Sequence, residues 1–295
     1  MLMSLPRIGR LAGAGLCLTM FQAAAAMAAE GRAEDWQMGF QPAVTPVAQQ
    51  MQDFHTLVLV IITGIVIFVM GLLAWVMYRY NEAANPVPSK SSHNTVIEVA
   101  WTVIPVLILL VIAVPSFRVL YAQYDAPPAD LTIKVTGHQW YWSYSYPDVG
   151  GFGFDSLLVE DADLKQGQRR LLSVDNEVVV PVNKVVHLLV TSDDVIHNWA
   201  MPSFGLKMDA VPGRNHLTWF RANEPGIYYG QCSELCGARH AFMPIAVRVV
   251  SEQEFAAWVE QAKQKFAASI PETSKTAQAN AGKPADPVLA SADRK

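Results

Sequence analysis

Two long apolar runs form a membrane part of the chain, and a strand-rich part follows them. Residues 56–78 and 99–117 contain no charged side chain. At ~1.5 Å per residue, these runs reach about 35 Å and about 28 Å, which suits a hydrocarbon core of about 30 Å. Two prolines lie in the second run, and membrane helices tolerate proline where neighbouring groups satisfy the freed carbonyls. The pattern predicts a transmembrane hairpin over residues 55–122, with spans at about 56–78 and 99–118.

The first residues follow a different pattern. Arg7 and Arg10 precede an apolar, alanine-rich stretch, which is typical of a secretory signal peptide over residues 1–29. An uncleaved membrane anchor is the alternative. Residues 30–54 are mixed polar and are expected to form an exported N-terminal arm. With either N-terminus, the two spans leave everything after residue 120 on the exported side, and the charges of the connecting loop agree weakly with this orientation.

Short alternating segments follow the hairpin. Residues 131–135 alternate between apolar and polar positions, and residues 140–146 place an aromatic side chain at every other position. Turn-forming pairs such as Pro212-Gly213 separate the segments. The other predicted strands are 177–181, 184–191, 216–220, 226–230 and 245–250. Many short strands at this spacing indicate a sandwich or barrel over residues 123–250.

The last part of the chain contains a helix signal and then loses all periodicity. Ser251 and Glu254 have the spacing of a capping box, which predicts a helix over residues 251–268. Residues 271–295 are rich in Ala, Lys, Pro, Asp and Ser and are expected to form a disordered tail.

Composition supports a membrane protein and excludes one class of partner. The chain is 52% hydrophobic and 16% charged, against about 25% charged in typical soluble proteins. Its net charge of -4 is too small to specify a partner. Because the sequence has no basic run or basic–aromatic stripe, nucleic-acid binding is not expected.

The stretch 232–243 concentrates the residues that bind soft metals. It contains Cys232, Cys236, His240 and Met243, and His197 lies upstream. Thiolate, thioether and imidazole ligands suit copper, but a blue-copper site needs only one cysteine. The second cysteine makes a second metal ion, bridged by both sulfurs, plausible. A disulfide and a structural zinc site are the alternatives from the residues alone.

Three motifs carry a resemblance to a known family. The run Cys-Ser-Glu-Leu-Cys-Gly-x-x-His-x-x-Met at 232–243 resembles the dinuclear copper A loop of cytochrome c oxidase subunit II. Gly-His-Gln-Trp-Tyr-Trp-Ser-Tyr at 137–144 and Asp-Ala-Val-Pro-Gly-Arg at 209–214 are similar to that family too. The similarity covers about residues 38–265. It implies a bacterial aa3-type subunit with a two-helix transmembrane hairpin, an all-β cupredoxin-like sandwich, a C-terminal helix and a disordered tail.

The resemblance also implies which residues bind metals. The expected copper A ligands are His197, Cys232, the backbone carbonyl of Glu234, Cys236, His240 and Met243. The Glu234 side chain would in addition help to hold a magnesium ion shared with subunit I; from the residues alone, it is a solvated loop acid.

Other roles are carried over from the family in the same way. Trp140 is the expected point of electron arrival, and its alternative is a core aromatic. Asp175 and Asp194 are expected to steer cytochrome c, and their alternative is an ordinary solvated surface. Glu98 is either an interfacial acid at a helix start or the mouth of a proton pathway into subunit I. Asp209 is expected to contact subunit I.

The docking surface departs from the family at one position. Ser145 stands where many relatives have an acid, so docking is expected to be weaker or differently distributed.

The function implied by the resemblance is electron transfer in respiration. The chain would take electrons from cytochrome c and pass them to haem a in subunit I, where oxygen is reduced to water with proton pumping; subunit III is a further expected partner. The expected location is the inner membrane, with the arm and the copper domain in the periplasm. Alternatives are a quinol oxidase subunit II, which lacks the copper ligands; nitrous-oxide reductase, which lacks the hairpin; and a copper carrier or zinc-stabilised module, which requires neither hairpin nor aromatic stretch.

Overall fold

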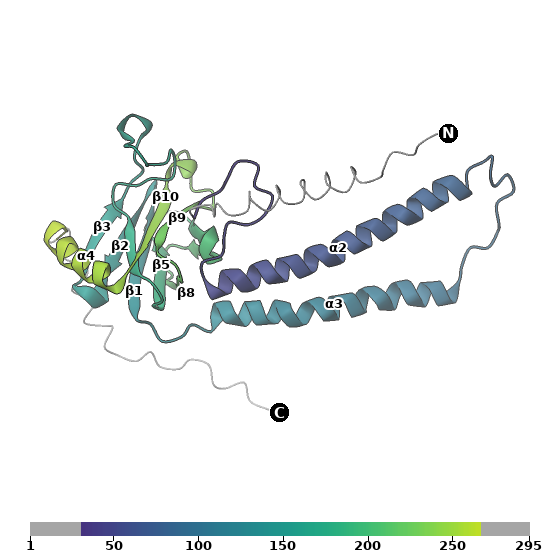
Figure 1. Ribbon diagram of the computed structural model, residues 1–295, viewed down its shortest axis with the longest axis horizontal. Helices are drawn as coiled ribbons and strands as arrows, with labels where there is room; N and C mark the ends of the chain where they lie inside the picture. The colour runs from purple at the N-terminus through teal and green to yellow at the C-terminus, as the bar shows by residue number, and fades with distance from the viewer. Residues whose placement is uncertain (1–30, 267–295) are drawn as a thin grey trace, which may run out of the picture.

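Two long helices lead into a β-sandwich in the computed structural model, which describes residues 31–266 (Figure 1). The predicted signal peptide, residues 1–29, and the predicted tail, residues 271–295, lie outside the described residues.

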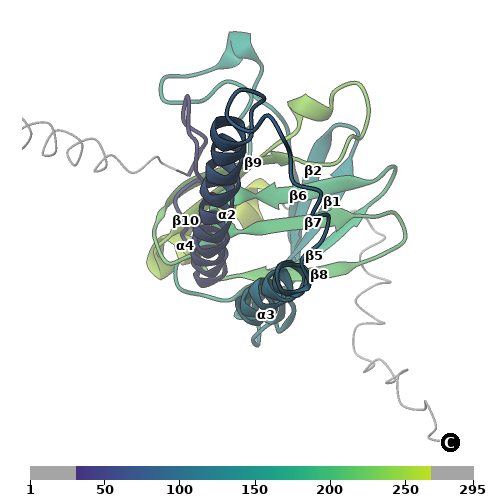
Figure 2. The ribbon, with the colours of Figure 1, turned by 90° about the vertical axis from the view of Figure 1, so that its right-hand side faces the viewer.

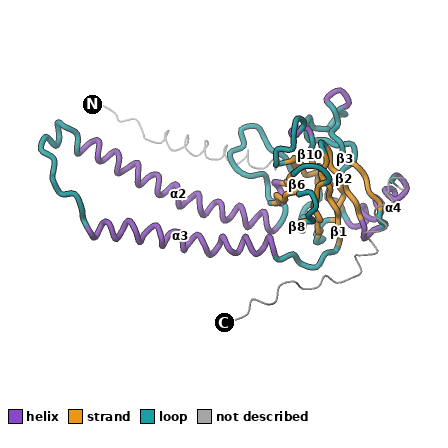
Figure 3. The backbone as a smooth tube through the Cα atoms, turned by 180° about the vertical axis from the view of Figure 1, so that it is seen from behind, coloured by secondary structure: helices purple, strands orange, loops and turns teal. Residues whose placement is uncertain are grey.

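The helical hairpin consists of α2 (Pro46–Arg79) and α3 (Thr95–Tyr124), which run side by side (Figures 1 and 3). Both are long and apolar enough to cross a membrane, and none of the residues in their apolar windows is buried. Each helix starts before its predicted span, because the capping residue determines where a helix starts. The Thr45 side chain accepts a hydrogen bond from the Ala48 amide, and the Asn94 side chain accepts from the amides of the first turn of α3.

The exported part is a sandwich of two five-stranded sheets, with strand orders β3-β2-β1-β5-β8 and β4-β10-β9-β6-β7. β1 pairs with β5 and β4 with β10 in parallel, and the other neighbours are antiparallel. The strands are β1 (Leu131–His138), β2 (Tyr141–Tyr146), β3 (Phe152–Ser156), β4 (Val178–Pro181), β5 (Val186–Ser192), β6 (His197–Met201), β7 (Leu206–Ala210), β8 (His216–Phe220), β9 (Gly226–Cys232) and β10 (Pro244–Val250). The predicted all-β sandwich is therefore confirmed.

Aromatic side chains of β2 fill the space between the sheets. Trp142, Tyr144 and Tyr146 are almost fully buried, because alternate residues of a strand face the same side of a sheet. Buried Tyr and Trp usually find hydrogen-bond partners, and two of these bonds join the sheets. Trp199 Nε1 donates to Tyr144 Oη at 3.2 Å, and Tyr146 Oη donates to the Val179 carbonyl at 2.9 Å.

The helix α4 (Glu252–Lys265) covers the sandwich on the side away from the hairpin (Figures 1 and 3). The predicted capping box is present, since Ser251 and Glu254 each accept a bond from the other's backbone. The Trp258 ring lies 5.3 Å from the Tyr146 ring. The amphipathic helix therefore buries its apolar face against the aromatic strands.

The start of α2 is fastened directly to the sandwich. Thr45 Oγ1 donates to the Phe204 carbonyl at 2.8 Å. Gly205 has a φ of +69°, and a Cβ there would lie 2.9 Å from the Ala48 Cα, so both its conformation and the close approach require glycine. Seen along the hairpin, α2 and α3 stand in front of the sandwich strands (Figure 2).

Candidate metal centre

Neighbouring strands bring the predicted metal ligands together. Cys232 ends β9, and β9 pairs with β6 so that Cys232 lies opposite Trp199. His197 begins β6, two residues before that position. The loop from residue 232 to 243 then returns to β10 and contains the short helix η5 (His240–Phe242). Ligands that are far apart in the sequence therefore meet at one end of the sheet.

The two thiols lie at the centre of the group. Cys232 Sγ and Cys236 Sγ are 3.9 Å apart, both residues are buried, and neither forms a disulfide. A metal–thiolate bond of the borderline-soft ions measures about 2.3 Å, so two such bonds can span this separation. Both sulfurs can therefore bind the same ion, and a second ion can bind them from the opposite side.

Each sulfur has its own imidazole. His197 Nδ1 lies 4.0 Å from Cys232 Sγ, and His240 Nδ1 lies 3.5 Å from Cys236 Sγ. Met243 Sδ is 3.4 Å from Cys236 Sγ, and the Glu234 carbonyl oxygen is 3.3 Å from Cys232 Sγ. All six predicted copper-ligand residues thus converge. Each sulfur is therefore in contact with one imidazole and one weaker donor.

The thiols titrate differently in the metal-free chain. Burial raises the pKa of both. For Cys232, contacts with His197 and with the amides of Asn198 and Glu234 outweigh burial and lower the pKa below its usual value. The negative charge of the Cys232 thiolate then raises the pKa of Cys236 further. Metal binding must therefore displace a proton from Cys236.

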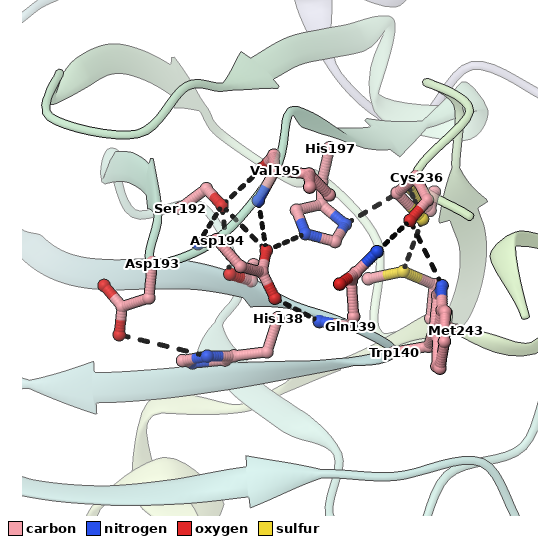
Figure 4. Close-up of polar contacts among 12 residues, drawn as sticks. His138, Gln139, Trp140, Ser192, Asp193, Asp194, Val195, His197, Cys236 and Met243 are labelled. Carbon is pink, nitrogen blue, oxygen red and sulfur yellow. Dashed lines mark hydrogen bonds and ion pairs between the residues drawn. The ribbon is translucent and has the colours of Figure 1, made fainter. Parts of the chain in front are cut away.

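His197 is held by a carboxylate on the side away from the thiols. Its ring is fully buried, and Nε2 lies 2.8 Å from Asp194 Oδ1 (Figure 4). Burial lowers the pKa of His197, but Cys232 and Asp194 together raise it above the usual value. Metal-binding histidines typically make this bond, which fixes the tautomer and the ring orientation. Asp194 thus orients a predicted copper ligand, a role that the sequence analysis did not assign to it.

The His197 ring also requires glycine at one position of β1. A Cβ at Gly137 would lie 2.8 Å from His197 Cδ2. The motif that begins at Gly137 therefore has a packing role at the centre.

Trp140 lies against the metal-binding loop. Its Nε1 donates to the Cys236 carbonyl at 3.3 Å, and Gln139 Nε2 donates to the same oxygen at 2.7 Å (Figure 4). The Trp140 ring is partly exposed while it packs against the core. Trp140 therefore makes the core contact of one sequence interpretation and also keeps the partial exposure that the other requires. Gln139 was missed, because nothing in its local sequence marks its bond to Cys236.

The two predicted docking acids are exposed, and both accept hydrogen bonds from backbone amides. Asp175 Oδ1 accepts a hydrogen bond from the Leu157 amide at 2.8 Å. Asp194 is 32% exposed, and its oxygens accept from the amides of Val195 and Gln139 as well as contacting His197. Both exposed carboxylates therefore stabilise local structure as well.

The other predicted site residues are placed as follows. Asp209, on β7, is exposed and accepts a bond from Asn198 Nδ2 at 2.6 Å. The Glu234 side chain is exposed on the metal-binding loop. Glu98 lies at the far end of the hairpin, where Oε1 accepts from the Asn94 amide at 3.0 Å. The structure does not bring Glu98 to the metal centre.

Comparisons with known proteins agree with these features. The family model "Cytochrome C oxidase subunit II, periplasmic domain" matches residues 131–250, and "Cytochrome C oxidase subunit II, transmembrane domain" matches residues 33–119. A "Probable cytochrome c oxidase subunit 2" of Rickettsia bellii is 55% identical over 234 residues, which are 79% of this chain and 87% of that protein. A "Cytochrome c oxidase subunit 2" of Cereibacter sphaeroides is 47% identical over 250 residues, with 79% and 82% covered.

The similarity extends to solved structures, among them one of a periplasmic domain. The periplasmic domain of subunit II of cytochrome oxidase of Bradyrhizobium japonicum is 64% identical, with a TM-score of 0.45, and the match covers 48% of this chain and 99% of that one.

Proposed function

This chain belongs to the cytochrome c oxidase subunit II family of membrane proteins with a periplasmic domain, and on that premise we propose that it accepts electrons from cytochrome c at a dinuclear copper A centre. It passes them to haem a in subunit I, where oxygen is reduced to water with proton pumping. The observation that carries this proposal is the pair of sulfurs 3.9 Å apart, each with its own imidazole. A mononuclear carrier would need only one of the two cysteines.

The ligand set follows the contacts of the sulfur pair. His197 and His240 would each bind one copper ion, Cys232 and Cys236 would bridge both ions, and Met243 and the Glu234 carbonyl would each be the weak ligand on one of them. When bound, the pair of copper ions supplies a one-electron store that both thiolates share. The chain's residues keep the ligands in place and exclude water, since His197 is fully buried and Met243 is 1% exposed.

Trp140 is the proposed point of electron arrival. Its indole ring is partly exposed, and its Nε1 reaches the carbonyl of a bridging cysteine. A donor protein that touches the exposed edge would therefore be connected to the metal centre through one hydrogen bond. Asp194, which accepts a bond from the Gln139 amide, and Asp175 would attract a basic cytochrome c over longer distances.

The remaining assignments concern the partner subunits. The exposed Glu234 side chain would bind a magnesium ion together with subunit I, since carboxylate oxygen suits this hard ion. The exposed Asp209 would contact subunit I, and subunit III would complete the assembly. Glu98 would lie at the mouth of a proton pathway. The protein would reside in the inner membrane, with the arm and the copper domain in the periplasm.

Copper stoichiometry and the electron paramagnetic resonance spectrum test the proposal. The full chain, purified in detergent and loaded with copper, should bind two copper ions. It should give a seven-line hyperfine pattern, because the unpaired electron is shared equally by two copper nuclei. Cys236→Ser should bind one ion with a four-line pattern. One ion per chain in the unaltered protein would disprove the dinuclear assignment.

A further inference from the structure

The two imidazoles of the metal centre are oriented by different means. His197 lies within β6, is fully buried and contacts the Asp194 carboxylate. His240 lies in η5 and is partly exposed. Within residues 31–266, no carboxylate contacts the His240 ring, whose Nδ1 lies 3.5 Å from Cys236 Sγ. Because a metal-binding histidine usually needs a second group to fix its orientation, something else must hold His240.

The backbone bonds within η5 do not provide that hold, and the bond that ties the loop to β9, from the Cys232 amide to the Met243 carbonyl at 3.3 Å, lies just beyond η5. The His240 amide donates to the Gly237 carbonyl at 3.2 Å, and the Phe242 amide donates to the Arg239 carbonyl at 2.8 Å. Both bonds lie inside the loop, so they shape η5 without tying it to the rest of the domain.

Arg239, next to His240 in the sequence, makes the longer-range contact. Its Nη2 donates to Glu160 Oε1 across 79 residues of sequence. Its guanidinium carbon also lies 5.5 Å from the centre of the Phe242 ring. The Arg239 side chain thus contacts Phe242 at the C-terminal end of η5. Its backbone directly precedes His240 at the N-terminal end. Arginine suits this double contact, because its planar group stacks on aromatic rings while it binds carboxylate.

Glu160 belongs to a surface excursion, residues 157–173, that projects from the sandwich (Figures 1 and 3). The base of this excursion is fixed by the bridge between Leu158 and Val174 and by the bond from the Val159 amide to the Ser173 carbonyl at 3.0 Å. Glu160 directly follows these paired residues. The Glu160 carboxylate therefore binds Arg239 from a backbone position that is fixed by this pairing.

We propose that Glu160 is a positioning residue for the metal centre: by holding Arg239, it fixes η5 and with it the orientation of His240. The inference rests on the proposed function, since it requires His240 to bind copper. Glu160 would thus orient His240 as Asp194 orients His197, but indirectly, through Arg239, and from the surface of the domain.

The expected effect is modest, because both partners are half exposed. The side chains of Arg239 and Glu160 are 50% and 57% exposed. Exposed ion pairs contribute little and are screened by salt, so loss of the pair should accelerate copper release roughly two- to fivefold at low ionic strength.

The test compares two neutralising substitutions in the same excursion, in the copper-loaded oxidase complex. Glu160→Gln removes the negative charge that Arg239 binds and leaves only a neutral hydrogen-bond acceptor. Asp161→Asn is the matched control, since Asp161 pairs with Arg170 at 2.8 Å and both partners are exposed at 59% and 63%. The first measurement is the rate of copper transfer to a chelator at low and high salt. The second is the nitrogen hyperfine coupling of the two histidines by pulsed electron–nuclear double resonance.

If the proposal is right, Glu160→Gln releases copper faster than the control at low salt, the difference disappears at high salt, and the coupling of one histidine nitrogen changes. Equal release rates and unchanged couplings in Glu160→Gln and the control would overturn the proposal. If the unaltered complex does not hold two copper ions, the proposed function itself has failed.

Discussion

Asp194→Asn should weaken copper binding more than any other single neutralisation of an exposed acid in the periplasmic domain. Asp194 Oδ1 lies 2.8 Å from His197 Nε2 and 2.6 Å from the Val195 amide, and Oδ2 accepts from the Gln139 amide at 2.7 Å. Asparagine keeps one oxygen and replaces the other with an NH₂ group. If the oxygen stays on His197, this NH₂ group faces the Gln139 N–H, and two donors oppose each other.

The expected magnitude follows from these contacts. A donor left without an acceptor at a desolvated position costs about 1–3 kcal/mol. Removing the carboxylate behind a metal-binding histidine typically lowers metal affinity about 10- to 100-fold, or about 1.4–2.7 kcal/mol. Asp194 is one-third exposed, so the lower half of this range is expected.

The assay is competition for copper with a chelator, together with cytochrome c oxidation kinetics at several salt concentrations. Asp193→Asn is the matched control, because Asp193 is 68% exposed and its contact is with His138 rather than His197. Asp194→Asn should lose copper affinity while the control does not. The reasoning is refuted if both variants retain copper equally and differ from the unaltered protein only by a salt-dependent rise in KM, since that is the behaviour of a docking acid.

Three further outcomes are expected. Gly137→Ala should destabilise the metal-free chain by about 1–3 kcal/mol in urea denaturation, because the added methyl group overlaps the His197 ring; an unchanged midpoint would contradict this. Trp140→Phe removes the indole N–H, so stopped-flow measurements should show slower reduction by cytochrome c with an unaltered copper spectrum; unchanged kinetics would leave it as a core aromatic. Hydrogen bonds from the side chain and amide of its N-cap serine lower the pKa of Glu254. Its stabilisation of α4 is therefore complete above the usual glutamate pKa and is lost as pH falls through the lowered value. The urea midpoint should decline less between pH 7 and pH 3 in Glu254→Gln, and an identical decline would refute this.

The hairpin and the strands with clear alternation could be predicted from local pattern. Residues 131–135 and 216–220 fall within observed strands, because a half-buried strand must alternate. Three strands were missed: β3 (Phe152–Ser156), β6 (His197–Met201) and β7 (Leu206–Ala210). All five residues of β6 are buried, and they include His and Asn, so neither alternation nor apolar character marks this strand. β6 is a strand because it pairs with β7 and β9.

Spacing alone identified the metal-binding loop, because four of its soft ligands fall within one short stretch of sequence. The groups that orient those ligands could not be found in the same way. Asp194 was predicted as a docking acid, although its position three residues before His197 allows the contact that the structure shows. Gln139 and Glu160 reach the loop from other parts of the domain.

The sequence by itself determined the membrane hairpin, the class of the exported domain and the chemical identity of the candidate metal ligands. These depend on apolar length, on alternation and on side-chain softness, which are properties of residues close together in the chain. Only the tertiary structure decided which imidazole faces which sulfur, which carbonyl Trp140 reaches and which acids orient ligands. Those relations depend on sheet pairing between segments far apart in sequence, where a shift of one residue would turn each side chain to the opposite face.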